Sequence, residues 1–310
     1  MSQVLAEAAV GPSVGIVAYM GTNDRGQPSN STVGLTMIGD LISRARISEG
    51  VRTTVHVNGQ PAPDTRLASF AIALLRYARS RRAFFIDVRT TFPPASGLGG
   101  SAAQFACIAR ALRKSVPEIE PLPTRVGRLC GSGIRAMKDG FVIWKRTGAL
   151  EVLDDGAVSE SIQGVAVLIS EKPKSTFSPD LHRAARRSPI FPLRATYCER
   201  VLVPEVTRAI QAGDIDRVFL AMTQENTWKH LTLLSGHPRA EFLMGDTATF
   251  LDALVRFSSA SGIRVGISVN YGPNIFVLVR GEAMDQLLGW VTARREARHV
   301  FRLRSLSAVA

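Results

Sequence analysis

The sequence predicts a protein of mixed helix and strand, in the α+β (two-layer α/β) class, folded as two halves. Segments with strand periodicity and segments with helical periodicity alternate along the 310 residues of the chain. A buried strand, "IQGVAVLIS", begins at residue 162, and the alternation starts again from there. We therefore predict an N-terminal domain over residues 1–165 and a C-terminal domain over residues 166–310.

The N-terminal half is predicted to alternate short strands with amphipathic helices. Short apolar runs and alternating runs, bounded by turn residues, predict strands at 14–20, 33–38, 52–58, 83–92 and 141–145. Apolar residues at helical spacing predict helices at 65–81 and 101–114, and a second glycine-bearing helix start at 129–140.

The C-terminal half is predicted to be richer in helix. The strand at 162–170 is followed by helical patterns at 178–187, 196–212, 214–235 and 246–261. The segment "VGISVNYGPNIFVLV" then predicts a strand, a turn and a second strand over 265–279, and a last helix begins at residue 282.

The charge balance suggests an anionic ligand. The chain has 38 Lys and Arg against 26 Asp and Glu, a formal net charge of +12. Such a balance is found in nucleic-acid-binding proteins. Here the basic residues are mostly arginines, spread along the chain and not interleaved with aromatic residues, which make up 7%. We therefore expect a small anionic molecule, bound by a few arginines, and not nucleic acid, as the main partner.

The cysteines and the termini point to a cytoplasmic protein. No apolar run reaches the roughly 20 residues of a membrane-spanning helix, and the N-terminal segment lacks the basic start of a signal peptide. Cys107, Cys130 and Cys198 show no metal-binding or redox spacing. We expect free thiols in a reducing compartment, with no structural metal and no membrane partner.

The most informative stretch is "FPPASGLGGSAAQFACIARAL" at residues 92–112, where glycines directly precede a strong helix former. Glycines let the backbone approach a polyphosphate, and the free N–H groups at a helix start attract its negative charge. Ser101 adds a hydroxyl that can reach a phosphate or Mg²⁺. No lysine follows the last glycine, so this is not a Walker-type loop.

Three other interpretations of this stretch stay open at this point. Gly97, Gly99 and Ala102 satisfy a dinucleotide fingerprint, but the proline-rich segment after the helix breaks the strand that should follow. Ser101 could be a hydrolase nucleophile, although none of the later histidines has the context of a triad; they are His230, His237 and His299. The glycines could also serve only to let an alanine-rich helix pack closely.

The whole stretch resembles the phosphate-binding motif of the GHMP kinase superfamily, and its flanks resemble the diphosphomevalonate decarboxylase branch. Further similarities follow in the order of the family along nearly the full chain. They are "AYMGTNDRGQPSNST" (substrate loop), "SGIRAMKDGFVIW", "RSPIF", "ENTWKHLTLLSGHP" and "NYGPN", which resembles the family's D-A-G-P-N.

This resemblance implies a GHMP kinase fold with the active site in a cleft between two domains, ATP and Mg²⁺ as cofactors, and a homodimer. It places the nucleotide phosphates on the glycine-rich loop, with Ser101 reaching Mg²⁺ through ATP; the loop residues are Pro94, Gly97, Leu98, Gly99, Gly100, Ser101, Ala102 and Ala103. It places the anionic substrate against Tyr19, Ser132, Arg135 and Ser188. Arg135 would hold the substrate carboxylate, because a planar guanidinium binds a carboxylate through two parallel hydrogen bonds.

The sequence also departs from the family at residues that carry chemistry. In the family, ATP phosphorylates a tertiary hydroxyl, and loss of phosphate and CO₂ gives an alkene. The aspartate that acts on this hydroxyl is replaced by Asn270, and two loop lysines are replaced by Ala18 and Thr22. The second loss removes a cation expected near the 5-phosphate. Asp24, which matches a family aspartate, is the substitute we place in the catalytic set, and Asp139 and His230 are further alternatives.

These departures favour a kinase over the complete reaction. Phosphoryl transfer depends chiefly on positioning and charge neutralisation, and a general base adds about 10²–10⁴-fold. We therefore expect an ATP-dependent small-molecule kinase that phosphorylates the hydroxyl of a mevalonate-like hydroxy acid in isoprenoid biosynthesis. The alternatives are an ATP-dependent decarboxylase of the family type and a nucleotide-binding pseudoenzyme.

Overall fold

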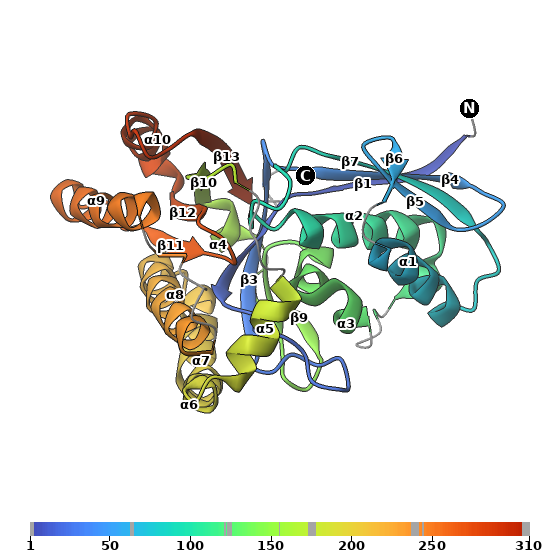
Figure 1. The fold of residues 1–310 in the computed structure, drawn as a ribbon, viewed down its shortest axis with the longest axis horizontal. Coiled ribbons are helices and arrows are strands. Elements are labelled where there is room, and N and C mark those ends of the chain that lie inside the picture. The colour runs from blue at the N-terminus through green and yellow to red at the C-terminus, as the bar shows by residue number, and fades with distance from the viewer. Residues whose placement is uncertain are drawn as a thin grey trace.

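The computed structural model describes residues 3–62, 65–120, 122, 126–154, 156–172, 178–236, 242–243 and 245–305. Two sheets carry the fold (Figure 1). The first sheet has the strand order β1-β4-β7-β5-β6, and only its β5–β7 pair is parallel. Its strands are β1 (Val4–Val10), β4 (Ser43–Glu49), β5 (Thr54–Val57), β6 (Gln60–Pro61) and β7 (Phe84–Thr90).

Helices of the N-terminal half cover one face of this sheet. The central helix, α2, packs against β1, β4 and β7, with α1 and α3 beside it (Figure 1). These helices are α1 (Arg66–Tyr77), α2 (Gly100–Ser115) and α3 (Gly127–Cys130). The strand β4 alternates in the way that a one-sided sheet requires, since Ala45 and Ile47 are buried while Arg44 and Arg46 are exposed.

The second sheet has the order β11-β12-β10-β13-β3-β8-β9, and β2 pairs with β3 outside this path. It joins strands from both halves of the chain, because β13 pairs with β3. Its strands are β2 (Ser13–Val17), β3 (Thr32–Gly39), β8 (Phe141–Trp144), β9 (Leu150–Val152), β10 (Ile162–Leu168), β11 (Gly266–Val269), β12 (Ile275–Arg280) and β13 (His299–Ser305). The predicted domain boundary at 165/166 falls inside β10, and the division into two domains stays a prediction.

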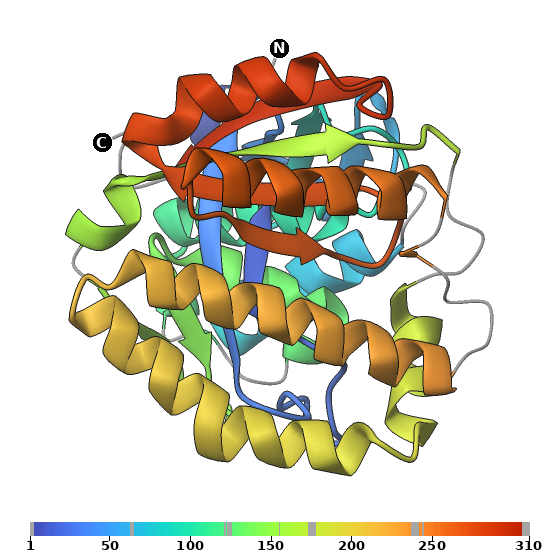
Figure 2. The ribbon, with the colours of Figure 1, turned by 90° about the vertical axis from the view of Figure 1, so that its left-hand side faces the viewer.

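Helices cover both faces of the C-terminal part of the second sheet. Ala166 and Leu168 of β10 pack toward α7 and α8, while Val165 and Val167 pack toward α9 and α10. This burial on both faces explains why β10 is apolar without interruption from Val165 to Leu168. Figure 2 shows each of the helices α7 to α10 extending from side to side across the view. The helices of this half are α4 (Ala157–Glu160), α5 (Ser178–Arg187), α6 (Phe191–Tyr197), α7 (Val203–Gln211), α8 (Ile215–Gly236), α9 (Asp246–Ser261) and α10 (Met284–Thr292).

The predicted mixed α/β class is confirmed, with local differences. The glycine-bearing helix predicted at 129–140 is a single α-turn followed by a 3₁₀ helix over Gly131–Met137. The helix predicted at 196–212 is continuous with α6 through a π-helical segment at Cys198–Leu202. The sequence prediction missed β1, β4 and β13, whose pairing partners lie 33 or more residues away in the chain.

Candidate functional site

The glycine-rich loop leads directly into the N-terminus of α2. Gly97 and Gly99 have φ angles of +77° and +87°, a region that favours glycine. A Cβ atom on Gly97 would lie 3.2 Å from the Cα atom of Gly272, so the loop touches the turn between β11 and β12. No side chain caps α2, and the exposed Ser101 stands in its first turn. The first N–H groups of such a helix have no partner within it, which suits an anion.

Asn274 holds the loop in place from the turn after β11. Its side-chain amide donates to the carbonyl of Ser96 at 2.7 Å, and its side-chain oxygen accepts from the N–H groups of Ile169 and Ser170 at 2.8 and 3.0 Å. Asn274 is buried, so these bonds are shielded from water. The glycine-rich loop, the end of β10 and the "NYGPN" turn therefore form one connected unit.

The 3₁₀ helix over Gly131–Met137 brings Ser132 and Arg135 beside this unit. A Cβ atom on Gly133 would lie 2.8 Å from the carbonyl oxygen of Ala102, so the 3₁₀ helix packs on the first turn of α2. Ser132 is half-buried, whereas Arg135 is only 2% exposed. The guanidinium group lies against Gly34 of β3, where a side chain would collide with it at 2.7 Å.

Arg135 is a buried cation whose charge is not neutralised within the described part of the chain. Its Nε and Nη1 atoms have no hydrogen-bond partner there, and no carboxylate forms an ion pair with it. Burial lowers the pKa of Arg135 to about 10, and the nearby Tyr271 and Tyr19 act in the opposite direction. Leaving buried donors unpaired costs folding free energy. A group in this state is suited to bind an anion that enters the site.

Two tyrosines and a histidine surround this region. The Tyr19 ring stacks on Trp144 at 5.7 Å between ring centres, and the His182 ring meets both Tyr19 and Tyr271 edge-on, at 4.8 and 4.6 Å. The Tyr271 hydroxyl donates to the carbonyl of Tyr19. Burial is the largest effect on both phenols and raises the pKa of each, so both stay protonated at neutral pH.

Three residues of α8 hold the strand end that precedes Asn270. The carbonyl of Val269 accepts hydrogen bonds from Lys229 Nζ and, at 2.9 Å, from His230 Nε2, while its N–H donates to Asn226. Burial is the main cause that lowers the pKa of Lys229 to about 7 and that of His230 to about 3. The His230 ring holds the Val269 backbone, and its lowered pKa keeps it neutral. Both properties are those of a structural residue.

Lys229 gives the protein a specific dependence of stability on pH. The unfolded chain binds the lysine proton up to about pH 10.4, whereas the folded chain releases it near pH 7. The unfolded state therefore binds more protons between these values, so this group makes stability rise with pH across that window. We expect Lys229→Met to raise the melting temperature at pH 7 and to flatten this rise, since His230 still bonds Val269. Thermal unfolding from pH 6.5 to 10 measures this, with Lys172→Met, at an exposed lysine, as control. A lower melting temperature for Lys229→Met at pH 7 would contradict the prediction.

The other predicted site residues lie on several different elements. Ser188 is buried, and its hydroxyl bonds that of Ser235 at 2.6 Å. Asp24 is exposed in the turn of the 21–29 loop. Asn270 is half-buried at the end of β11. His237 lies outside the described residues. The assignment of these and the other site residues stays a prediction.

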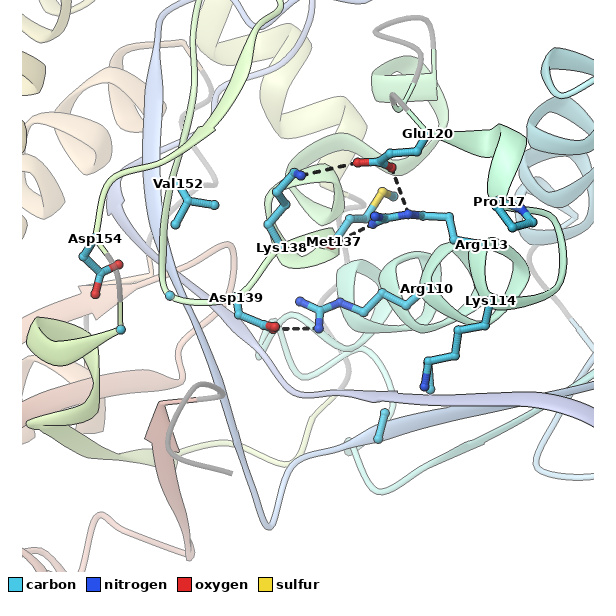
Figure 3. A pocket seen from close by; sticks show the side chains of 14 residues that line it. Arg110, Arg113, Lys114, Pro117, Glu120, Met137, Lys138, Asp139, Val152 and Asp154 are labelled. Carbon is cyan, nitrogen blue, oxygen red and sulfur yellow. Dashed lines mark hydrogen bonds and ion pairs between the residues drawn. The ribbon is translucent and has the colours of Figure 1, made fainter. Parts of the chain in front are cut away.

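A separate cavity of about 750 Å³ lies at the other end of α2 (Figure 3). It is lined by charged residues that largely pair with one another: Arg110 with Asp139 at 2.6 Å, and Glu120 with both Arg113 and Lys138. Arg110 follows Gly100 by ten residues, roughly 15 Å along the helix. Asp139, one of the alternative bases, therefore serves this ion-pair network and not the glycine-rich loop.

Several residues of the centre were missed by sequence reasoning. Tyr271 lies inside the "NYGPN" motif, in which only Asn270 was given a role. Asn274 ends the same motif and Lys229 lies in "ENTWKHLTLLSGHP", but neither was given a role, and His182 lies in no motif; the roles of all three come from contacts with distant parts of the chain. Arg194 and Glu225 form a buried ion pair. Glu225 also accepts a hydrogen bond from the N–H of Ala18, just before Tyr19, at 3.2 Å.

Among the described residues, no group of three or more His, Cys, Asp or Glu is arranged to hold a metal ion. Within the same residues, no helix combines the length and the apolar character needed to cross a membrane.

Comparison with known proteins finds similarity to one family. Residues 10–154 match the model of the diphosphomevalonate decarboxylase-like N-terminal domain. The diphosphomevalonate decarboxylase of Rattus norvegicus is 22% identical over 310 aligned residues, covering 90% of this chain and 77% of the relative. The mevalonate diphosphate decarboxylase structure from Staphylococcus aureus has a TM-score of 0.85 at 17% identity, covering 97% of this chain and 95% of that one.

A further structure is described as MDDEF in complex with MVAPP, AMPPCP and magnesium, with a TM-score of 0.81 and 20% identity over 97% of both chains. At these identities the structures establish the fold. The kinase interpretation of the sequence is wrong in the light of the relatives, because proteins matched over most of the chain are named decarboxylases. The alternative interpretation, an ATP-dependent decarboxylase, agrees better with them.

Proposed function

We propose that this chain belongs to the diphosphomevalonate decarboxylase-like branch of the GHMP kinase superfamily and catalyses the ATP-dependent decarboxylation of a phosphorylated 3-hydroxy acid. The observation that carries this proposal is the buried Arg135 guanidinium with two unpartnered nitrogens beside Tyr19 and Tyr271. A carboxylate would supply the missing charge and hydrogen bonds. Diphosphomevalonate, the substrate in the names of the relatives, is the first compound to test, and isoprenoid biosynthesis is the corresponding pathway.

The glycine-rich loop fits a nucleotide polyphosphate. The positive φ angles at Gly97 and Gly99 turn the backbone toward α2, whose uncapped N-terminus presents N–H groups, and Ser101 is exposed in the first turn. With no acidic metal cluster among the described residues, Mg²⁺ would arrive with the nucleotide and be reached by Ser101. When bound, ATP with Mg²⁺ supplies the phosphoryl group that turns the substrate hydroxyl into a leaving group.

The chain's own residues would orient the substrate for loss of CO₂. Arg135 would orient the carboxylate through its guanidinium N–H donors, and Gly34 limits the movement of the guanidinium group. Asn270 can hydrogen-bond to the substrate hydroxyl but cannot accept its proton as a carboxylate does. The proton of the hydroxyl would then leave without a strong base, which predicts slow turnover. A cytoplasmic location and a homodimer remain predictions.

The test is an assay of both products. Purified protein is incubated with ATP, Mg²⁺ and diphosphomevalonate labelled at its carboxyl carbon, and labelled CO₂ and ADP are measured. Equal amounts of ADP and CO₂ are expected. ADP without CO₂ would contradict decarboxylation. Stabilisation of the fold by ATP, with neither product formed, would indicate the nucleotide-binding pseudoenzyme that the loss of the family aspartate also allows.

We expect Asn270→Asp to increase the rate of CO₂ release. The substitution is nearly isosteric and restores a carboxylate that can accept the hydroxyl proton, which is worth about 10²–10⁴-fold where the geometry suits. An increase of kcat of at least roughly tenfold is the expected result, with Asn58→Asp, in an exposed turn, as the matched control. An unchanged or lower kcat with intact folding would show that Asn270 does not face the reacting hydroxyl.

A further inference from the structure

The cavity at the C-terminal end of α2 has a surplus of positive charge on its α2 side. Among the described residues, its lining includes four cations and three carboxylates, which are Arg110, Arg113, Lys114 and Lys138, and Glu120, Asp139 and Asp154. Asp154 lies away from α2 in Figure 3, and it accepts hydrogen bonds from the N–H groups of Phe141 and Ser159 at 2.9 and 3.0 Å. The part of the lining nearer α2 therefore has four cations and two carboxylates.

The two carboxylates on this side already have partners. Asp139 pairs with Arg110 at 2.6 Å. Glu120 pairs with Arg113 at 2.8 Å and with Lys138 at 3.3 Å. These ion pairs leave the six groups with two positive charges that no carboxylate of this side balances.

Arg110 and Lys114 keep hydrogen-bond donors for a ligand. Arg110 Nε donates to the carbonyl of Ala136 at 3.0 Å and Nη1 pairs with Asp139, but the buried Nη2 has no partner among the described residues. Lys114 Nζ donates to the carbonyl of Glu7 at 2.8 Å, and within the described chain it forms no ion pair. An ammonium group has three donors, so two of those of Lys114 remain. Leaving the Arg110 donor unpaired costs folding free energy, which a bound anion would recover.

Three of the cations share one face of α2. Arg110, Arg113 and Lys114 lie three and four positions apart, a spacing at which side chains are neighbours and like charges repel. The dipole of α2 favours cations in its last turn, but Arg110 lies five residues before its last residue, Ser115. Burial is the largest effect on Arg110 and lowers its pKa; Asp139 acts against this effect and Arg113 adds to it. An anion bound between these cations would relieve their repulsion.

We propose that this cavity binds a small phosphate monoester, with Arg110 and Lys114 as its main donors. A phosphate monoester carries about −1.5 to −2 charges at pH 7 and has three strong acceptor oxygens, which match the two positive charges and the free donors. The volume of about 750 Å³ lies within the range of about 300–1,000 Å³ found for small-molecule sites. The site is separate from the glycine-rich loop at the other end of α2, and it does not depend on the proposed function.

The test measures where a phosphate monoester binds. Glycerol 3-phosphate is titrated into the ¹⁵N-labelled full chain, and amide chemical shifts are followed separately at residues 110–120 and at the glycine-rich loop. We expect saturable shifts at residues 110–120. Lys114→Gln should raise the Kd obtained from these shifts roughly 10- to 100-fold, while Lys172→Gln, at another exposed lysine, should leave it within about twofold. Arg110→Lys keeps the charge but removes Nη2, so it should raise this Kd roughly tenfold.

Three results would overturn the proposal. Shifts confined to the glycine-rich loop would show that the cavity does not bind phosphate. An unchanged Kd in Lys114→Gln, or an equal rise in Lys172→Gln, would show that the charged groups of the cavity serve only the ion pairs within the protein. Tighter binding of citrate than of glycerol 3-phosphate at residues 110–120 would assign the cavity to carboxylates and not to phosphate esters. Thermal unfolding checks that each variant folds, and Lys114→Gln alters an exposed side chain, so the test does not depend on Arg110→Lys.

Discussion

Arg135→Met is expected to abolish most of the decarboxylase activity while making the protein more stable. Loss of two hydrogen bonds to a charged carboxylate costs about 1.5–3 kcal/mol each, which corresponds to a fall in kcat/KM of roughly 10²–10⁴-fold. Stability should increase by about 1–4 kcal/mol, because an unpaired buried charge is replaced by an apolar side chain of similar length. Denaturant unfolding and the CO₂ assay measure the two effects on the same samples.

Two further variants separate charge from geometry at this position. Arg135→Lys keeps the charge but loses the planar fork, so we expect intermediate activity. Arg110→Met removes another largely buried arginine, but one that pairs with Asp139 and donates to the carbonyl of Ala136 at 3.0 Å. It should lose stability and keep kcat/KM. If Arg135→Met were as destabilising as Arg110→Met, Arg135 would be a structural residue with a partner of its own.

Breaking the buried ion pair between Arg194 and Glu225 should destabilise the protein more than any other change described here. Both side chains are almost completely buried, at 0% and 2% exposure. Arg194→Met leaves the Glu225 carboxylate without its partner, which costs about 3–5 kcal/mol for a buried pair. Denaturant unfolding measures this loss. Arg256→Met, which breaks an exposed pair with Asp252, should change stability by less than about 1 kcal/mol.

A double-mutant cycle tests whether the pair itself causes this loss. Arg194→Met combined with Glu225→Leu removes both charges, and it should be more stable than the single Arg194→Met variant. The double variant also loses the bonds from Arg194 to the carbonyl of Ala18 and from the N–H of Ala18 to Glu225. These bonds hold the backbone next to Tyr19, a predicted substrate-binding residue. The KM of the double variant for the substrate should therefore rise even where its stability recovers. Additive stability effects in the cycle would contradict a coupled pair.

Local patterns in the sequence predicted most of the helices and the motifs of the candidate site. The glycine-rich loop, α2 and α8 follow from periodicity and turn residues within short windows. The strand β4 carries a clear alternation that is typical of a strand, whereas β13 follows α10 closely and lies within the segment predicted to end the chain as a helix. The 3₁₀ conformation at 131–137 follows from close packing of Gly133 on α2, a constraint that no local pattern contains.

The sequence predicted the motifs of the candidate site one by one, but it could not predict which residues of different motifs are in contact. Nothing near Gly97 in the sequence indicates Gly272, and nothing near Tyr19 indicates Tyr271. Such pairs meet because sheet pairing brings distant strands together. The lowered pKa of Arg135 likewise comes from its burial. The space for its guanidinium group depends on Gly34, which lies in β3.

The turn after β11 separates two tasks within five residues. Asn274, at its end, holds the glycine-rich loop and the end of β10 through buried hydrogen bonds. Asn270, at its beginning, is half-buried at the position that would face the reacting group. A substitution at the first position can therefore alter the proposed chemistry without loosening the glycine-rich loop. The side chain proposed to face the substrate and the side chain that fixes the loop are different ones, so each can be replaced while the other stays.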